Sequence, residues 1–482
     1  MATADYTHLN EFVEYQKNMP QLNFRILLFA VLCCFLCSGV TIRDRVLIES
    51  LHRIERLALV QPTEKQLFEG AMLGTFEVLE RLGDDYSAYV PFAGQKEYED
   101  NLDNRLEGIG IVYRENPVSK AVEIIYPMVD SPAWHAGIRA GDQITAIDEK
   151  KTDEIPFKEI SRLIKGKLGT EVVLSVLHRN ATESVDISIK RSPIQRPSIE
   201  GLSLNDDGKR NFALPTESEI AYLRITSFSD QTAAEVAEAL RRILDDKKKG
   251  LILDLRGNPG GYIASCVATA NFFVAPNDQY DLVVSTRFRD GLIKGRYRTF
   301  KEGKFFDPPM VVLIDGESAS AAEILSACLQ DYRRATIVGS RSFGKGTVQE
   351  IFDLPLQSGK FQLTDASYWR PSGRNINRVK DAGDSDEWGV SPDPEGLLPV
   401  AREQRIAQAM IRDHRANIIA SDADEIIADL LKRISEEVKS FRSEKQEKTA
   451  EPFQLQGTAP YYDPQLEKAV EILKKKITEP QP

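Results

Sequence analysis

The pattern of apolar and polar positions changes repeatedly along the 482-residue chain. The segment from Phe24 to Ile42 is almost wholly apolar, and residues 43–104 repeat apolar positions with a helical period. Residues 105–192 contain short alternating runs typical of strands, with one helical segment, and residues 193–398 alternate strand-like runs with helical ones. Residues 399–482 are charged and helical in pattern. Because one hydrophobic core rarely organises more than about 300 residues, we expect several domains.

The apolar segment from Phe24 to Ile42 follows a polar leader, residues 1–23, and contains a single charge, Arg25. Its run of about 17 uncharged residues is at the short end for a helix that spans a bilayer. No A-x-A-like cleavage site precedes Arg43, which favours an uncleaved membrane anchor over a signal segment that is removed. Basic residues flank both ends, so charge does not fix the orientation.

The two regions with a helical pattern differ in regularity. Apolar side chains between Thr63 and Arg81 recur on one face, and Gly83 with the turn after it predicts the end of that helix. The C-terminal region is interrupted at residues 437–452 by a Lys/Glu/Ser-rich stretch with the composition of a flexible tether. We see no catalytic motif in the C-terminal region.

Residues 193–398 have the alternation of strands and helices that defines an α/β domain. The runs GLILDL (250–255) and MVVLID (310–315) are apolar apart from one aspartate each, as in parallel strands that are buried on both faces. We therefore expect a largely parallel sheet covered by helices on both sides. Ligands of such sheets bind at the carboxyl ends of the strands, so the loops after these runs are where we expect a site.

Composition disfavours several classes of function. The net charge of −11 argues against a nucleic-acid-binding protein, which needs a basic face to neutralise phosphates. The five cysteines do not indicate a disulfide framework, because three of them lie inside the apolar N-terminal segment. All the histidines lie outside residues 193–395, and no His/Cys/Asp cluster has the spacing of metal ligands. We expect neither a histidine base in the α/β domain nor a metal or cofactor.

Three unusual segments follow strand-like runs: DLRGNPGGY (254–262), DGESASAAEI (315–324) and GSRSFGKGTVQ (339–349). Glycine lets backbone N–H groups approach a ligand, and a helix that begins at Ser318 or Ala319 offers free N–H donors to a developing negative charge. Ser320 at that helix start is a candidate nucleophile. Lys345 is a candidate general base if burial lowers its pKa from about 10.4.

The last of these segments also fits two other patterns. Residues 342–345 match S-x-x-K, but that motif needs a helix, which Gly344 and Gly346 oppose. Residues 339–345 match the nucleotide-binding loop G-x-x-x-x-G-K. There, Gly346 stands where a Ser or Thr must hold magnesium, and TVQEIF has the pattern of a strand, not of a phosphate-binding helix. A P-loop-type NTPase is therefore the less favoured alternative.

In these motifs the chain resembles the carboxyl-terminal processing (tail-specific) serine proteases, whose core has the ClpP/crotonase fold. GNPGG, SASAAE and FGKGTVQ occur in the family's order, and GVSPDP follows at residues 389–394. Upstream, EGIGI with SPAWHAGIRAGDQITAID resembles a PDZ domain. The resemblance implies an α/β protease core at residues 193–398 with an inserted PDZ-like β domain at residues 105–192. Helical N- and C-terminal segments and the N-terminal membrane anchor would complete the chain.

The resemblance also implies roles for single residues of the core. Ser320 would be the nucleophile, Lys345 the general base and Gln349 the residue that orients the lysine. In a fully extended strand Lys345 and Gln349 would be about 13 Å apart, so a contact between them requires a turn. The oxyanion hole would combine the backbone N–H of Ala321 with that of one residue of the glycine pair, and the choice within that pair stays open. The pair is Gly260 and Gly261.

In the PDZ-like part, the resemblance implies that backbone amides of one loop hold the carboxylate of a substrate's C-terminus. The loop residues are Gly108, Ile109, Gly110 and Ile111. Lys165 occupies a position where relatives often carry arginine, which puts a bidentate contact there in doubt.

The function implied is a serine endopeptidase that cleaves proteins near unstructured, apolar C-terminal tails through an acyl-enzyme, without a cofactor. Its catalytic region would be extracytoplasmic, on the periplasmic side, and either held at the membrane or secreted if the N-terminal segment is cleaved. A homo-oligomer stays open. The alternative is an anchored PDZ scaffold with an inactive protease-like domain.

Overall fold

The computed structural model describes residues 41–116, 120–301, 306–383, 385–420, 426 and 463–479. The chain divides into two compact units, Met1–Arg81 and Leu82–Pro482. The expected leader, the tether and all but the last two positions of the expected anchor lie outside the described residues. Within the described ranges, no helix is both long and apolar enough to cross a membrane.

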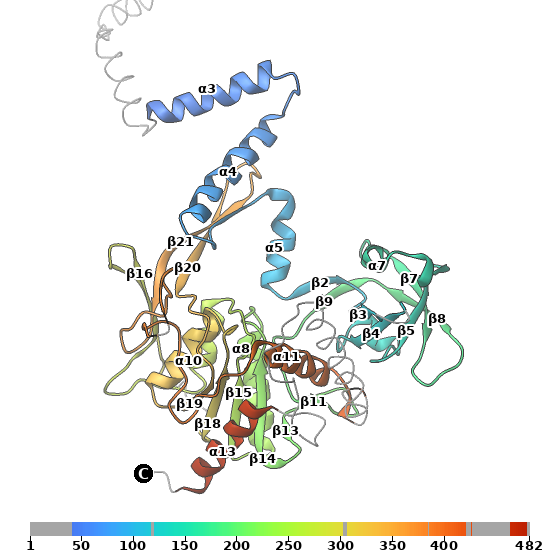
Figure 1. Cartoon of the computed structure of the whole chain (residues 1–482), viewed down its shortest axis with the longest axis vertical. Helices are drawn as coiled ribbons and strands as arrows, with labels where there is room; N and C mark the ends of the chain where they lie inside the picture. The colour runs from blue at the N-terminus through green and yellow to red at the C-terminus, as the bar shows by residue number, and fades with distance from the viewer. Residues whose placement is uncertain are drawn as a thin grey trace, which may run out of the picture. The chain divides into compact units, whose positions relative to one another are not determined.

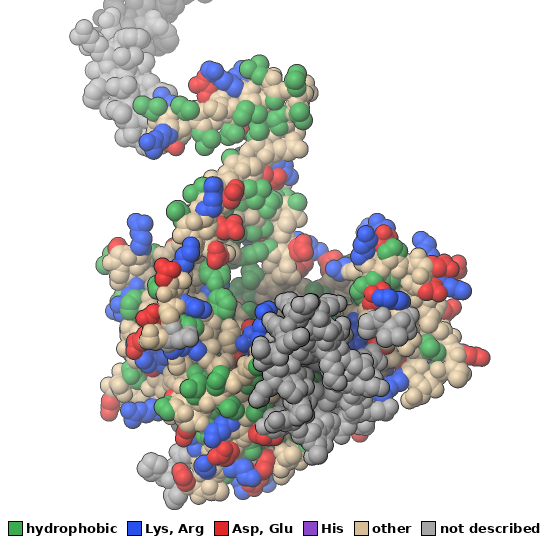
Figure 2. Space-filling view, in the orientation of Figure 1, with side chains coloured by type: hydrophobic (Ala, Val, Ile, Leu, Met, Phe, Trp, Pro, Cys, Tyr) green, Lys and Arg blue, Asp and Glu red, His purple; other side chains and the backbone are tan. Residues whose placement is uncertain are grey.

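The first unit contains the helices α3 (Ile42–Leu57) and α4 (Glu64–Arg81). α3 begins with a capping box, in which Asp44 N–H donates to Thr41 Oγ1 at 3.3 Å and Thr41 N–H donates to Asp44 Oδ2 at 2.6 Å. α4 is the helix that the sequence predicts between Thr63 and Arg81. Figure 2 shows apolar side chains along both helices, and α3 has no buried residue.

Residues 105–195 form a β domain with one antiparallel sheet, ordered β3-β4-β5-β7-β8, in which β6 also pairs with β5. Burial alternates along β7, where Val172, Leu174 and Val176 all point into the core. β2 and β9 pair antiparallel where the chain enters and leaves the domain. The elements are β2 (Arg105–Gly108), β3 (Ile111–Glu115), β4 (Val122–Pro127), α6 (Pro132–His135), β5 (Gln143–Ile147), β6 (Lys150–Lys151), η2 (Thr152–Glu154), α7 (Phe157–Ile164), β7 (Glu171–Leu177), β8 (Val185–Lys190) and β9 (Ser192–Gln195).

The α/β domain is built on a parallel sheet in which β14, β15, β18 and β19 are neighbours in that order. β15, β18 and β19 are buried at every residue, which is why their sequences are apolar apart from Asp254 and Thr336. The short strands β10 and β13 pair antiparallel with β14, and β11 pairs with β12. The strands are β10 (Ile199–Glu200), β11 (Ser203–Leu204), β12 (Arg210–Asn211), β13 (Ala213–Leu214), β14 (Glu217–Ile225), β15 (Gly250–Asp254), β18 (Met310–Ile314) and β19 (Ala335–Gly339).

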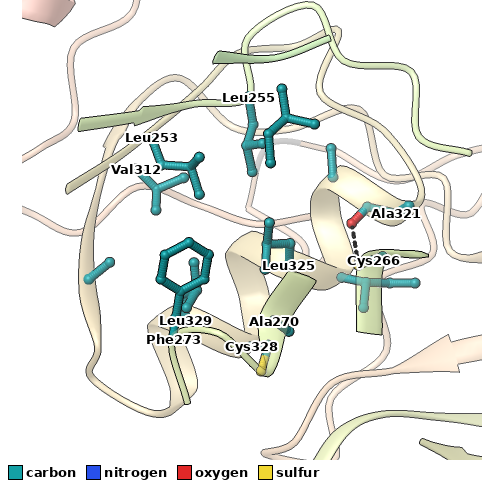
Figure 3. Close-up of a cluster of buried hydrophobic side chains, with 14 of the residues drawn as sticks. Leu253, Leu255, Cys266, Ala270, Phe273, Val312, Ala321, Leu325, Cys328 and Leu329 are labelled. Carbon is teal, nitrogen blue, oxygen red and sulfur yellow. Dashed lines mark hydrogen bonds between the residues drawn. The ribbon is translucent and has the colours of Figure 1, made fainter. Parts of the chain in front are cut away.

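Helices cover both faces of this sheet, as the sequence predicts. On one face, Leu253 and Val312 pack with Leu325 and other side chains of three helices (Figure 3). On the opposite face, Ile252 packs with Leu473 of the C-terminal helix, which lies beside β15 and β18 (Figure 1). The helices are α8 (Thr232–Asp245), α9 (Ile263–Ala270), α10 (Ala321–Asp331) and, on the opposite face, α13 (Pro464–Thr478); α11 (Arg402–Ala416) precedes α13 in the chain.

A second, antiparallel sheet, ordered β1-β21-β16-β17 with β20 also paired to β21, was not predicted. It corrects the expectation of helices throughout residues 43–104, because β1 lies within that range. β1 pairs with a strand about 270 positions later, for example Tyr89 with Phe361, so no local pattern reveals it. The elements are β1 (Ala88–Val90), η1 (Phe92–Gly94), α5 (Gln95–Leu102), β16 (Leu282–Phe288), β17 (Ile293–Arg298), β20 (Thr347–Asp353) and β21 (Lys360–Trp369).

Leu473→Ala should lower the free energy of unfolding by about 2–5 kcal/mol, because the side chain is fully buried between α13 and the sheet. Denaturant unfolding of the full chain, followed by circular dichroism, measures the change. Lys474→Ala is the matched control on the exposed side of the same helix and should cost less than about 1 kcal/mol. Equal stability of Leu473→Ala and the wild type would contradict the packing of α13 on the sheet.

Candidate active site

The three loops singled out in the sequence meet at the carboxyl ends of β15, β18 and β19. Ser318 Oγ donates to Leu255 O at 2.8 Å, and Ala319 N–H donates to Asn258 O at 2.9 Å. Phe343 N–H donates to Ser318 O at 3.0 Å, which connects the third loop to the second. The topology therefore brings together segments that are separated by up to 95 positions in the chain.

Ser320 is the N-cap residue of α10, which begins at Ala321, slightly later than the sequence suggests. Its backbone has φ 54° and ψ −115°, an uncommon conformation for a residue with a side chain. Hydrogen bonds hold this conformation: Ser320 N–H donates to Glu323 Oε2 at 2.8 Å, and Ile324 N–H donates to Ser320 O at 3.0 Å. Such strain persists only where the surroundings enforce it and is concentrated at functional sites.

Lys345 is half-buried in the loop that leads into β20, and its burial lowers its pKa from the ordinary value of 10.5. The charge of Glu323 acts in the opposite direction and raises the pKa of Lys345. The Nζ atom lies 4.5 Å from the centre of the Tyr86 ring, which comes from the segment before β1. Burial thus shields the amine in part from water, and no described carboxylate forms an ion pair with Nζ.

A buried carboxyl, Glu323, connects Ser320 to the lysine loop. Its Oε2 accepts from the backbone N–H of Ser320 and of Lys345, both at 2.8 Å. Its Oε1 accepts from Gly344 N–H and Ser342 Oγ, both at 2.6 Å. Burial raises the pKa of Glu323 to about 7, while these four hydrogen bonds act to lower it. The sequence analysis missed this role, although a glutamate three residues after a helix-capping serine is the signature of a capping box.

Gln349 lies on β20, and the structure gives it other partners than Lys345. Its Nε2 donates to Thr347 Oγ1 at 3.0 Å and to Thr364 Oγ1 at 3.2 Å. Thr364 Oγ1 in turn donates to Asp84 Oδ1 at 2.8 Å. Gln349 thus helps to connect β20 and β21 with the segment that contains Tyr86, and its role in orienting the lysine stays a prediction.

The strand after Lys345 decides against a nucleotide-binding loop. Residues 347–353 form β20, whereas a P-loop needs a helix there to bind phosphate. The same absence of a helix around residues 342–345 removes the S-x-x-K alternative.

The two glycines considered for the oxyanion hole differ in their hydrogen bonds. Gly260 N–H donates to Asn258 Oδ1 at 2.8 Å and is therefore occupied. Within the described structure, the N–H groups of Gly261 and Ala321 have no acceptor. Both glycines have positive φ, and a Cβ on Gly260 would lie 2.7 Å from Ser320 Cβ, so this loop approaches the serine as closely as glycine permits.

In the β domain, the loop of residues 108–111 runs from the last residue of β2 to the first residue of β3, which is the edge strand of its sheet. Gly110 has φ +80°, and a Cβ there would lie 2.3 Å from Ser131 Cβ. Ser131 Oγ donates to Gly110 O at 3.1 Å, so the loop is held from one side. An edge strand that begins with such a loop can accept an added peptide strand. Lys165 follows α7 directly and is exposed.

Comparison with known proteins places both domains. Residues 219–395 match the family model described as Peptidase family S41, and residues 123–177 match the model of a PDZ domain. The carboxy-terminal-processing protease of Bartonella bacilliformis is 33% identical over 348 residues, which cover 71% of this chain and 72% of that protein. The carboxy-terminal processing protease CtpA of Bacillus subtilis is 31% identical over 336 residues, or 70% of this chain and 65% of that protein.

Among solved structures, the photosystem II D1 C-terminal processing protease is similar, with 23% identity and a TM-score of 0.40 over 74% of this chain and 93% of that one.

Glu323→Gln should change the pH dependence of stability. Because the pKa of Glu323 is raised to about 7, the folded chain keeps its proton up to a higher pH than the unfolded chain, in which the pKa is the ordinary 4.5. The stabilising contribution of Glu323 is therefore fully present below about pH 4.5 and is lost as the pH rises through about 7. The loss of stability that Glu323→Gln causes relative to the wild type should therefore be larger at pH 5 than at pH 8.

Denaturant unfolding at the two pH values measures this difference. Glu317→Gln, at an exposed position of the same loop, is the control and should change the free energy of unfolding by less than about 0.5 kcal/mol. A difference between Glu323→Gln and wild type that is the same at both pH values would show that the pKa of Glu323 is not raised.

Proposed function

We propose that Ser320 and Lys345 are the catalytic pair of this chain, which belongs to peptidase family S41 and is a serine-type peptidase. Its membership of that family confirms the resemblance that the motifs indicate. The observation that carries the proposal is the Glu323 carboxyl, which accepts hydrogen bonds from the backbone of both residues at 2.8 Å. In this reading residues 193–398 form a protease core of the ClpP/crotonase type, and residues 105–192 form the PDZ domain.

The proposed reaction is hydrolysis of a peptide bond through an acyl-enzyme. Ser320 Oγ bonds to the carbonyl carbon of the substrate while its proton moves to the neutral amine of Lys345. The C–N bond then breaks, and the Lys345 ammonium gives the proton to the leaving amine. Water then attacks the ester carbonyl while Lys345 accepts its proton. The ester bond to Ser320 breaks, the proton returns to Ser320 Oγ, and the second product leaves as the acid. The lowered pKa of Lys345 and the lack of an acidic partner for Nζ among the described residues support this role.

The negative oxygen that forms on the substrate carbonyl needs hydrogen-bond donors already in place. We assign these donors to the N–H groups of Gly261 and Ala321. Both lack an acceptor within the described structure, whereas the N–H of Gly260 is held by Asn258. Gly260 would then be required because it has no side chain, since a Cβ at this position would collide with Ser320.

For the PDZ domain we propose binding of substrate C-termini. The peptide would add as a strand to the free edge of β3, and the backbone amides of Gly108 to Ile111 would receive its carboxylate. The relatives are named for carboxy-terminal processing, which fits a domain that recognises chain ends. Unstructured proteins with apolar tails are the proposed substrates. An extracytoplasmic location and anchoring through residues 24–42 stay predictions from the sequence.

Ser320→Ala and Lys345→Arg should each lower the rate of cleavage of an unstructured protein, β-casein, by at least about 10³-fold. Alanine removes the nucleophile, and arginine keeps the positive charge but cannot give up its proton. Mass spectrometry of the fragments measures cleavage, and Lys380→Arg, at an exposed lysine, is the matched control with wild-type activity.

The wild-type kcat/KM should rise with pH and level off above the lowered pKa of Lys345. Substantial turnover by Lys345→Arg, or a rate that is flat from pH 5 to pH 9, would contradict the lysine as base. Cleavage retained by Ser320→Ala would show that the nucleophile lies elsewhere. A wild-type chain that does not cleave would favour the inactive PDZ scaffold.

A peptide with a free C-terminal carboxylate should bind the full-length Ser320→Ala chain at least several-fold more tightly than the same peptide amidated, because amidation removes the charge that the loop would hold. Calorimetry measures both affinities. Gly110→Ala should abolish the preference, since its Cβ would collide with Ser131. Gly169→Ala is the matched control, because Gly169 has nearly the same φ, +81°, with nothing within 4 Å of a Cβ. Equal affinity for acid and amide peptides would remove carboxylate recognition from this domain.

A further inference from the structure

The glycine-rich loop beside Ser320 begins at a fully buried charge cluster. Arg256 has 1% of its surface exposed, and its guanidinium lies between Asp254, from the end of β15, and Asp463, the N-cap residue of α13. Arg256 Nη1 donates to Asp463 Oδ1 at 2.9 Å, and Nη2 donates to Asp463 Oδ2 at 2.7 Å. Residues 207 positions apart thus form a bidentate ion pair in which both side chains are buried.

The hydrogen bonds of Arg256 are complete. On the other side of the guanidinium, Nε donates to Asp254 Oδ1 at 3.0 Å and Nη2 donates to Asp254 Oδ2 at 2.7 Å. Gln465 Oε1, also from α13, accepts from Nη1 at 3.2 Å. Every nitrogen of a guanidinium therefore has an acceptor, and two of the three acceptor side chains come from the C-terminal helix.

This cluster is joined directly to the backbone of the loop. Arg256 N–H donates to Asp254 Oδ1 at 2.9 Å, and the next residue, Gly257, donates its N–H to Asp315 Oδ1 at 3.0 Å. Asn258 then holds Gly260 through its Oδ1 and Ala319 through its carbonyl oxygen. Successive hydrogen bonds thus hold the chain from Arg256 to Gly260, and Asp254, which accepts the first of them, also accepts from the Arg256 side chain.

Docking of α13 does not by itself require this ion pair. Ala469, Ile472 and Leu473 are at most 4% exposed and already bury an apolar face against the sheet. A buried ion pair seldom adds stability over well-packed apolar residues, because both charges lose their hydration. Its geometric effect is specific, since the fork of a guanidinium fixes the direction of both carboxylates.

We infer that Asp463, supported by Gln465, is a positioning residue for the peptidase reaction. It holds Arg256, and through it the loop of residues 257–261, in the conformation that turns the Gly261 N–H toward the substrate carbonyl. Only these two side chains at the start of α13 have this role, and neither touches the substrate. This inference rests on the proposed role of Gly261 as an oxyanion donor.

The kinetic test uses the full chain with β-casein as substrate. Asp463→Asn keeps the shape but removes the charge and one acceptor from Arg256. It should lower kcat at least about tenfold and leave KM within about threefold, because the oxyanion forms only in the transition state. Gln465→Ala removes one weaker acceptor and should lower kcat by a smaller factor. It takes the place of Asp463→Asn if that variant does not fold.

Leu473→Ala is the matched control, since it loosens the same helix without touching Arg256. Its kcat per folded molecule, with folding checked by circular dichroism at the assay temperature, should equal that of the wild type. A purely structural role of Asp463 would instead leave kcat per folded molecule unchanged in Asp463→Asn as well, and that result would overturn the inference.

Amide hydrogen exchange separates this inference from the proposed function. In Asp463→Asn, exchange in residues 255–262 should rise at least about tenfold, while exchange in β18 stays at the wild-type rate. Unchanged exchange in residues 255–262 would overturn the inference, whatever the rates of cleavage. If exchange rises as expected but Ser320→Ala cleaves as fast as the wild type, the loop depends on Asp463 as inferred and the proposed function fails.

Discussion

The arrangement of the site depends on one buried carboxyl group. Glu323 accepts hydrogen bonds from the backbone of Ser320 and of Lys345, so one side chain fixes the spacing of two loops that the sequence separates by 25 positions. The same group holds Ser320 in a conformation that a free chain avoids. Burial of an acid costs stability, and four hydrogen bonds offset that cost. The strain at Ser320 therefore follows from the hydrogen bonds of Glu323, whereas the raised pKa of Glu323 follows from its burial.

The cluster around Arg256 repeats this principle at the start of the loop of residues 257–261. In both places a buried charged side chain connects separate elements: Glu323 of α10 connects Ser320 to the loop before β20, and Arg256 connects the end of β15 to the start of α13. The sheet supplies the rigid frame, because β15, β18 and β19 are buried along their whole length. Apolar packing can place helices and strands, but only directional hydrogen bonds fix the orientation of single N–H groups in a loop. Buried charge is thus used where orientation matters.

In the proposed function, the two domains use different parts of the backbone for recognition and for cleavage. In the PDZ domain a glycine-containing loop and the free edge of β3 would offer amide groups to a peptide end. In the core domain another glycine-rich loop would offer amides to the carbonyl that is attacked. Glycine is needed in both places because a Cβ at Gly110 or Gly260 would collide with a neighbouring serine. Polar backbone groups would therefore hold the substrate, while Ser320 and Lys345 carry out the reaction.

The sequence by itself determined the parallel strands, the three loops and the candidate residues Ser320 and Lys345. It could do so because buried parallel strands are continuously apolar, and because the motifs are contiguous in the chain. Only the tertiary structure decided that Tyr86 covers Lys345, that Gly261 and not Gly260 has a free N–H, and that Gln349 bonds to Thr347 and Thr364. The same holds for β1 and for Asp463, which lie in regions that the sequence marked only as helical. Each of these depends on contacts between distant positions or on the direction of one hydrogen bond, and neither leaves a periodic signal in the local sequence.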